Sequence, residues 1–402
     1  MRLLNNSFYC FHDISQTIKE IKKAYYEPNE FIKTKYSYLG WHGATIWEQV
    51  KNNVFPQISN SERFLEQNFI DIFNDVLLQK QFDIVSLGSG LGNDDFMILD
   101  ILNEFNKNSQ NSAEIVNYYF LDISFYLLYK CSSNLKERIN RWDFTDKNPM
   151  NAFFINVDLE SLKINNVKKE IFDNNNYSKV KEVRKKLFHL LGLTLGNNHE
   201  ELFLRNISNL MNKGDLLLFD IDCYDLIVQE HLNSFNNSID EYYKQKYIIN
   251  EHTIPFLTNS ILFLFLYENK NLQDSSIHIP LYSEINVRGQ IKFEKTNNEK
   301  NIEIVDESFL KYIKLYSEEK KEKGDPLFTN IPLTKTYIRK HEYFFQNNIS
   351  DSKKVCDYSN KYVSNSFYSF LTENEIFKNL FENRKPSPYS LNNIEYFLLE
   401  KK

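Results

Sequence analysis

The sequence FDIVSLGSGLGNDD, residues 82–95, decides the fold of this chain. It begins with an apolar run of strand length, and Gly88, Gly90 and Gly92 follow directly. Only 10 of the 402 residues are glycine, so a G-x-G-x-G pattern would arise by chance with a probability of about 0.006. Apolar residues at helical spacing come next, starting at Phe96. The stretch therefore predicts a strand, a glycine loop and a helix whose N-terminal N–H groups face a ligand.

Further apolar runs follow this strand at intervals suited to helical connections. Such runs, separated by stretches of roughly 20 to 30 residues, are typical of βα units on a parallel sheet that is buried on both faces. We therefore expect an α/β fold with a doubly wound, Rossmann-like core. The predicted strands are 82–87, 116–121, 153–157, 186–193 and 215–221, and 394–399 is a candidate closing strand.

The same patterns divide the chain into four regions. A helical N-terminal layer that contributes to the substrate pocket is expected at 1–78, and the ligand-binding core at 79–225. An α+β accessory subdomain for substrate recognition is expected at 226–385, and a closing strand of the core sheet at 386–402.

Within the accessory region, alternating apolar residues predict antiparallel strands at 277–282 and 290–293, joined by a turn at Gly289. The charged, tyrosine-rich segment 313–360 gives no clear pattern.

Composition excludes several classes of protein. The net charge is −6, and the strongest basic run, Lys320–Lys323, is interrupted by Glu322, which argues against a nucleic-acid-binding surface. The 4 cysteines lie far apart, and the 8 histidines show no paired ligand spacing, so no metal site is expected. The sequence shows no membrane span or signal peptide, which predicts a cytoplasmic protein.

The glycine spacing indicates the ligand. A dinucleotide fingerprint has the form G-x-G-x-x-G, whereas here the third glycine comes one residue early, as in S-adenosylmethionine (SAM) methyltransferases. Asp122 ends the second predicted strand, where an acid would bind the ribose hydroxyls, and Asp158 follows the third, where it would accept from the adenine amino group. Either aspartate alone is equally well explained as a strand-end cap. The expected cofactor is SAM, and the candidate cofactor-binding residues are Gly88, Ser89, Gly90, Gly92, Asp122, Asp158 and Gly192.

A longer stretch, residues 185–222, resembles the histidine-specific SAM-dependent methyltransferase family. In that family the fourth strand ends in a segment like F-L-G-S-T-I-G-N, and Gly192, Thr194, Gly196 and Asn197 match it at the same spacing. The family's D-I-S after the second strand is reproduced from Asp122, and GWHGATIWEQV, residues 40–50, is similar to an N-terminal family segment. The resemblance covers about residues 36 to 222 and implies methyl transfer from SAM to an amine.

The resemblance also implies residues for catalysis and substrate binding. Asn197 would hold the substrate amine, unless it merely caps the following helix. Tyr38 matches a tyrosine near the amine with a one-residue shift. Asp306 and Ser308 echo a motif that reads the imidazole, although a charged helix start explains them as well. Catalysis is thus assigned to Asn197 and Tyr38, and substrate binding to these two with Asp306 and Ser308.

The sequence departs from the family where the family holds the substrate carboxylate. Phe55-Pro56-Gln57 replaces a Y-Y-P-T-R segment, and a second tyrosine is replaced at Asn233 or Ser234. Free histidine is therefore not the favoured substrate. We expect an N-methyltransferase that acts on an amino acid, a related small molecule or a peptide. A non-catalytic SAM-binding module and, less consistent with the charge, a nucleic-acid methyltransferase stay open as alternatives, as does the oligomeric state.

Overall fold

The structure is a computed structural model. It describes residues 2–26, 33–54, 59–77, 81–108, 113–141, 149–173, 184–198, 200–222, 256, 259–260, 262–264, 267, 281–292, 306–316, 328–339, 358–362, 376–380 and 394–402.

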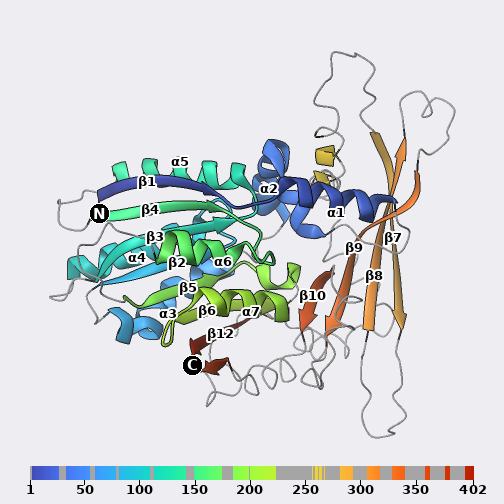
Figure 1. Ribbon diagram of the computed structural model, residues 1–402. Helices are drawn as coiled ribbons and strands as arrows, with labels where there is room; N and C mark the ends of the chain where they lie inside the picture. Colours follow the sequence, from blue (N-terminus) through green and yellow to red (C-terminus); the bar gives the residue numbers. More distant parts are fainter. Residues whose placement is uncertain are drawn as a thin grey trace, which may run out of the picture.

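A large mixed sheet organises the fold (Figure 1), with strand order β1-β4-β3-β2-β5-β6-β12-β11. The strands from β1 to β6 are parallel to their neighbours, β12 is antiparallel to β6, and β11 is antiparallel to β12. The predicted parallel strands are thus confirmed, and the segment near the C-terminus pairs beside β6. The bounds are β1 Arg2–Cys10, β2 Gln81–Leu87, β3 Glu114–Asp122, β4 Pro149–Asn156, β5 Lys186–Leu190, β6 Leu216–Asp222, β11 Phe377–Asn379 and β12 Ile394–Lys401.

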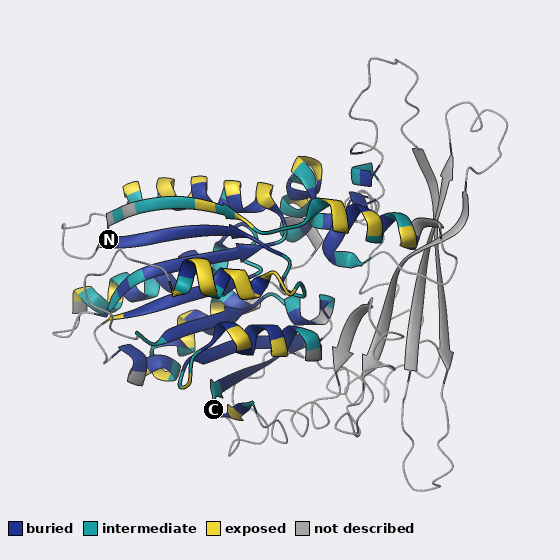
Figure 2. Cartoon of the chain, in the orientation of Figure 1, coloured by how far each residue is buried: buried dark blue, intermediate teal, exposed yellow. Residues whose placement is uncertain are grey.

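Helices cover both faces of this sheet, as a doubly wound fold requires. One face packs against α3 (Ser59–Leu77), α4 (Asn93–Asn108) and α5 (Phe125–Arg141). The other face packs against α6 (Ile164–Val167), the turn η3 (Lys168–Phe172) and α7 (Glu200–Leu210). Figure 2 shows the central strands as almost wholly buried. This burial explains why the strands read as continuous apolar runs.

The N-terminal region is helical except at its start. The helical elements are α1 (Ile14–Tyr26), the 3-10 turn η1 (Thr34–Tyr38), α2 (Gly40–Val54) and α3. The expectation of helix from residue 1 is wrong for Arg2–Cys10, which pairs with β4 as an edge strand. The reason is tertiary: the Asn5 side-chain amide donates to Asn151 Oδ1 at 2.9 Å, and Phe8 stacks on Phe154 at 4.9 Å.

A second, four-stranded sheet has the order β10-β9-β8-β7. Its strands are β7 (Leu281–Lys292), β8 (Asp306–Tyr316), β9 (Phe328–Arg339) and β10 (Tyr358–Tyr362). The expected turn at Gly289 is wrong, because β7 runs straight through it and Gly289 pairs with Phe309. Pairing along the whole of β8 outweighs the local turn preference of one glycine. Residues 277–280 and 293, which belonged to the expected strands, lie outside the described residues.

The second sheet also reaches the core, because β10 lies against β6 and against η4 (Thr194–Asn197). In the described part of the chain, no helix combines the length and apolar character needed to cross a membrane.

The turn between β2 and α4 depends on Gly92. The carbonyl of Gly92 accepts from the Phe96 N–H at 2.8 Å and so begins the helix. Its φ is +83°, and a Cβ there would lie 2.7 Å from both Cys131 Sγ and the Phe96 ring. Gly92 is therefore required both by its backbone conformation and by the packing of α4 against α5.

We expect Gly92→Ala to lower the free energy of unfolding by about 2 to 4 kcal/mol, since strain at positive φ adds to overpacking. Gly192→Ala is the matched control, because its φ is +78° but nothing lies within 4 Å of the added Cβ. That variant should cost only about 1 kcal/mol. Denaturant titration of both variants measures the difference, and equal losses would contradict the packing role of Gly92.

Candidate functional site

A cavity lies where the central parallel strands end, at the edge of the sheet where ligands bind in open α/β folds. Its walls come from the loops after β2, β3, β4 and β5, together with η1, α2 and the start of α5. The lining residues are Lys35, Tyr38, Trp47, Gly88, Gly90, Asp122, Ile123, Leu127, Asp158, Leu159, Gly192, Thr194, Asn197 and Asn198.

Most of the residues singled out in the sequence meet in this cavity: Tyr38, Gly88, Gly90, Asp122, Asp158, Gly192 and Asn197. Ser89 and Gly92 belong to the same loop but do not line the cavity. Asp306 and Ser308 lie on β8, where their backbones pair with Lys292 and Gln290. The alternative explanation, that these two begin a charged helix, is wrong, because pairing with β7 makes them part of a strand.

Asp122 ties the glycine loop to the end of β3. Its carboxylate accepts from the Gly90 N–H at 2.9 Å and from the Ser124 N–H at 2.7 Å. The N–H groups of Gly88 and Ser89 both donate to the Leu121 carbonyl, at 2.8 and 3.1 Å. Burial raises the pKa of Asp122 to about 6, although the N–H groups of Gly90 and Ser124 favour the ionised form. The carboxyl therefore titrates just below neutral pH.

Asp220 holds a second turn, the one that carries Asn197. Its carboxylate accepts from the Gly192 N–H at 3.0 Å and from the Leu193 N–H at 2.9 Å. Leu193 has a φ of +62°, a conformation that is costly for a residue with a side chain. Burial raises the pKa of Asp220 to about 7. Asp220 was not predicted from the sequence, where it is marked only as one of two aspartates at the end of a predicted strand.

Tyr38 comes from η1 and packs at the cavity wall. Its ring meets Trp47 and Phe256 edge-on, each at 5.0 Å between ring centroids. Burial, with the nearby charge of Asp122, raises the pKa of Tyr38 above its ordinary value, so its hydroxyl stays protonated at neutral pH. Trp47 was quoted in the sequence only as part of a family-like segment, and no spacing marked it as a cavity residue.

Asn259 holds the turn that carries Tyr38. Its buried side-chain amide donates to the carbonyls of Ser37 and Leu39, at 2.9 and 2.8 Å. These two carbonyls flank Tyr38 in the chain, so the amide fixes the backbone on both sides of it. A residue more than 200 positions away in sequence thereby orients the tyrosine.

Lys35 brings a buried positive charge into the cavity. Its ammonium lies 2.9 and 2.8 Å from the two Asp158 oxygens and also contacts Glu160. Burial by itself would lower the pKa of Lys35, but the carboxylates of Glu160 and Asp158 raise it above its ordinary value. Sequence reasoning missed Lys35 and Glu160, which no motif marked.

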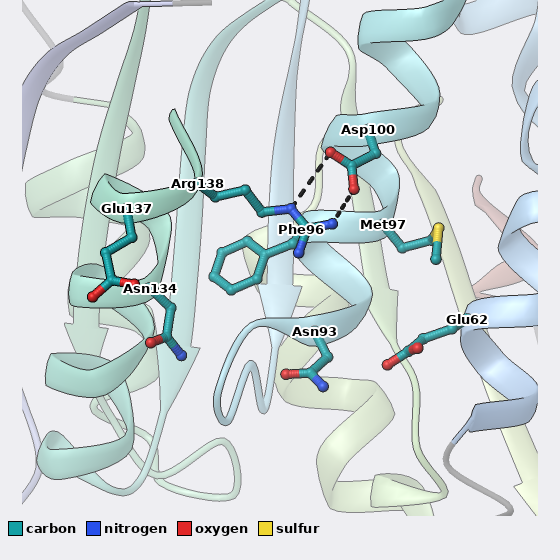
Figure 3. A pocket seen from close by; sticks show the side chains of 8 residues that line it. All are labelled: Glu62, Asn93, Phe96, Met97, Asp100, Asn134, Glu137 and Arg138. Atoms are coloured by element: carbon teal, nitrogen blue, oxygen red, sulfur yellow. Dashed lines mark hydrogen bonds and ion pairs between the residues drawn. The ribbon is translucent and has the colours of Figure 1, made fainter. Parts of the chain in front are cut away.

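Figure 3 shows a separate hollow lined by residues of α3, α4 and α5. There Arg138 lies over the Phe96 ring at 5.7 Å and pairs with Asp100. The pair joins α5 to α4. None of the residues predicted for the site lines this hollow.

Among curated proteins nothing matches this chain. Similar solved structures include the plantazolicin methyltransferase BpumL in complex with SAH, at 14% identity, 68% of this chain, 83% of that chain and a TM-score of 0.31. The citrinin polyketide synthase CMeT domain is 16% identical over 36% of this chain and 30% of that chain, with a TM-score of 0.23. The [4+2]-cyclase SpnF is 12% identical over 39% of this chain and 44% of that chain, with a TM-score of 0.24. At these TM-scores none of the three bears on the function of this chain.

The family comparison is decisive. The sequence model of the histidine-specific, SAM-dependent methyltransferases matches residues 17–244, more than half of the chain. The match includes η1, α2, the glycine loop, Asp122, Asp158 and the Gly192 turn, which form the cavity. With the core fold and the matched residues in agreement, the chain belongs to the family of histidine-specific, SAM-dependent methyltransferases, and its cofactor is SAM.

Proposed function

We propose that this methyltransferase acts on an amine of an amino acid, a related small molecule or a peptide. One observation carries the proposal: Tyr38 and Asn197, far apart in sequence, line one cavity with Gly88, Gly90 and Asp122. The first two are the residues expected at the acceptor amine, and the others are those expected at the cofactor.

The residues present fit SAM. Gly88 and Gly90 expose their backbone to the cavity, and a Cβ on Gly88 would come within 3.1 Å of the Thr194 methyl group. Within the described residues, the buried Ser89 hydroxyl of the same loop has no hydrogen-bond partner. Asp122 and Asp158 supply carboxylate acceptors for hydroxyl and amino groups. The chain would thus hold the cofactor by its glycine loop and these two acids.

When bound, SAM supplies an electrophilic methyl group on a positively charged sulfur. The protein's own contribution is to align the acceptor and to keep it neutral. Trp47, Leu127 and Leu159 line the cavity with apolar surface, which favours the uncharged form of an amine. The Asn197 amide orients this amine without adding charge. The protonated Tyr38 hydroxyl serves as a hydrogen-bonding partner and not as a strong base.

The acceptor class is wider than free histidine because the sequence lacks both tyrosines expected at the substrate carboxylate. Those positions, 55–57 and 233–234, lie outside the described residues. The proposal therefore rests on their side-chain chemistry, since no residue of Phe55-Pro56-Gln57, and neither Asn233 nor Ser234, carries a phenol. A peptide or an amide-linked acceptor would not need such a carboxylate clamp.

Asn197→Ala tests the role of the amide. Incubation with SAM and a panel of the twenty amino acids, simple amines and short peptides, read by mass spectrometry, should identify an acceptor for the wild-type protein. On that acceptor we expect the variant to lose about 10² to 10³ in turnover, as when an oriented polar group is removed. Calorimetry should show S-adenosylhomocysteine affinity within about threefold of wild type, since the amide is assigned to the amine.

Asn209→Ala is the matched control, because Asn209 is exposed on α7, outside the cavity. It should leave both turnover and cofactor affinity unchanged. A parallel loss of both properties in Asn197→Ala would instead make Asn197 a residue that shapes the cofactor site. Failure of every amine in the panel, with methylation of a hydroxyl or carbon acceptor, would overturn the proposal.

The Asp122 carboxyl predicts a pH dependence. With a pKa of about 6 it is ionised above that pH, and the ionised form is the better acceptor for ribose hydroxyls. S-adenosylhomocysteine affinity should be constant above neutral pH and fall by up to about tenfold per pH unit below 6. Calorimetry between pH 5 and 8 measures this. Asp122→Asn should bind weakly at every pH; if it keeps the wild-type slope, another group such as Asp220 is responsible.

A further inference from the structure

Lys35 and Tyr38 share one turn of backbone. Both belong to η1, and residues three apart in a 3-10 helix point the same way. The side chains of both line the cavity. The turn is held at its end by the Asn259 amide and at its start by the Tyr36 N–H, which donates to the Lys33 carbonyl at 3.0 Å. Lys35 and Tyr38 are therefore joined by a short segment whose backbone is hydrogen-bonded at both ends.

At the other end of its side chain, Lys35 meets two carboxylates. Its ammonium contacts both oxygens of Asp158 and one of Glu160, and its side chain is only 8% exposed. The Glu160 N–H donates to Asp158 Oδ1 at 3.0 Å, so a hydrogen bond joins the two acids in the turn after β4. The Lys35 ammonium thus balances most of the charge of two carboxylates, with Lys33 3.7 Å from Glu160 as a second cation, and an uncompensated acid there would be costly.

This arrangement competes with the cofactor for Asp158. Asp158 is the acceptor proposed for the adenine amino group, yet both of its oxygens already accept from Lys35, and Oδ1 also accepts from Glu160. A carboxylate offers about four lone-pair positions. A cofactor that reaches Asp158 must therefore share it with Lys35 or move the ammonium towards Glu160.

We propose that Lys35 is a positioning residue that couples the adenine end of the cofactor site to Tyr38. When a ligand takes an Asp158 oxygen, the Lys35 ammonium is held chiefly by Glu160, and η1 carries the Tyr38 ring to its working position. The inference rests on the proposed roles of Asp158 and Tyr38. To these two roles it adds the buried cation Lys35, which links cofactor binding at Asp158 to the position of Tyr38 at the acceptor site.

The test uses the full-length protein and S-adenosylhomocysteine, so that no methyl acceptor is needed. Trp47 lies 5.0 Å from the Tyr38 ring and also lines the cavity, so its fluorescence responds both to the bound ligand and to the position of that ring. In wild type, we expect saturating S-adenosylhomocysteine to change the tryptophan emission, and Trp47→Phe to abolish that change. Lys35→Met should bind about tenfold more weakly by calorimetry and, at saturation, show less than a fifth of the emission change. Lys35→Arg should keep at least half of it.

Lys33→Met is the matched control. Lys33 lies 3.7 Å from Glu160 and 3.4 Å from Glu20, so its loss removes a neighbouring charge without touching Asp158. It should keep the full emission change. If Lys35→Met does not fold, as judged by circular dichroism, Glu160→Gln takes its place, and the emission change should again fall below half.

Two results would overturn the inference. A full emission change in saturated Lys35→Met, whatever its affinity, would make Lys35 a mere counter-ion of Asp158. The same holds if wild type binds S-adenosylhomocysteine with no Trp47-dependent change, because η1 would then not respond to the cofactor. An absence of binding in wild type is a separate outcome: it would remove the cofactor site itself, and the coupling with it.

Discussion

The site depends on the hydrogen bonds that the Asp122 carboxylate accepts from backbone N–H groups. The carboxylate accepts the Gly90 N–H on one side and the Ser124 N–H on the other, and so joins the glycine loop after β2 to the beginning of α5. A parallel sheet brings the ends of β2 and β3 together, but it does not set the path of the loops beyond them. A buried acid that binds backbone on both sides sets that path, at the cost of a raised pKa.

The same device recurs on the other side of the cavity. Asp220 accepts from Gly192 and Leu193 and holds a turn in which a leucine adopts a left-handed conformation. Strain of this kind persists only when surrounding contacts compensate for it. Two buried acids, each bound to two backbone N–H groups, thus support two of the loops that form the cavity. Both acids are harder to ionise than an exposed aspartate, since burial raises the pKa of each.

Lys35 adds a third and different constraint. The carboxylates of Asp122 and Asp220 accept from backbone N–H groups, whereas those of Asp158 and Glu160 are held mainly by the Lys35 ammonium, which has three donors on a flexible side chain. Such a contact is exchangeable in a way that backbone contacts are not. The cavity therefore combines two rigid loops with one adjustable ion cluster at the end proposed for adenine.

Sequence was sufficient for the core fold, since the apolar runs, the glycine loop and the acids at the strand ends are local patterns with a direct physical cause. It was sufficient for Gly88 and Asp122 as cavity residues, because each lies at a strand end, and for Asn197 through the family motif that follows the fourth predicted strand. It was not sufficient for β1, Asp220, Asn259 or Lys35. Their roles come from partners distant in the chain: β4 for the strand, the Gly192 turn for Asp220, η1 for Asn259, and Asp158 for Lys35. Periodicity records which face of an element is buried, whereas only folding decides which polar groups meet there.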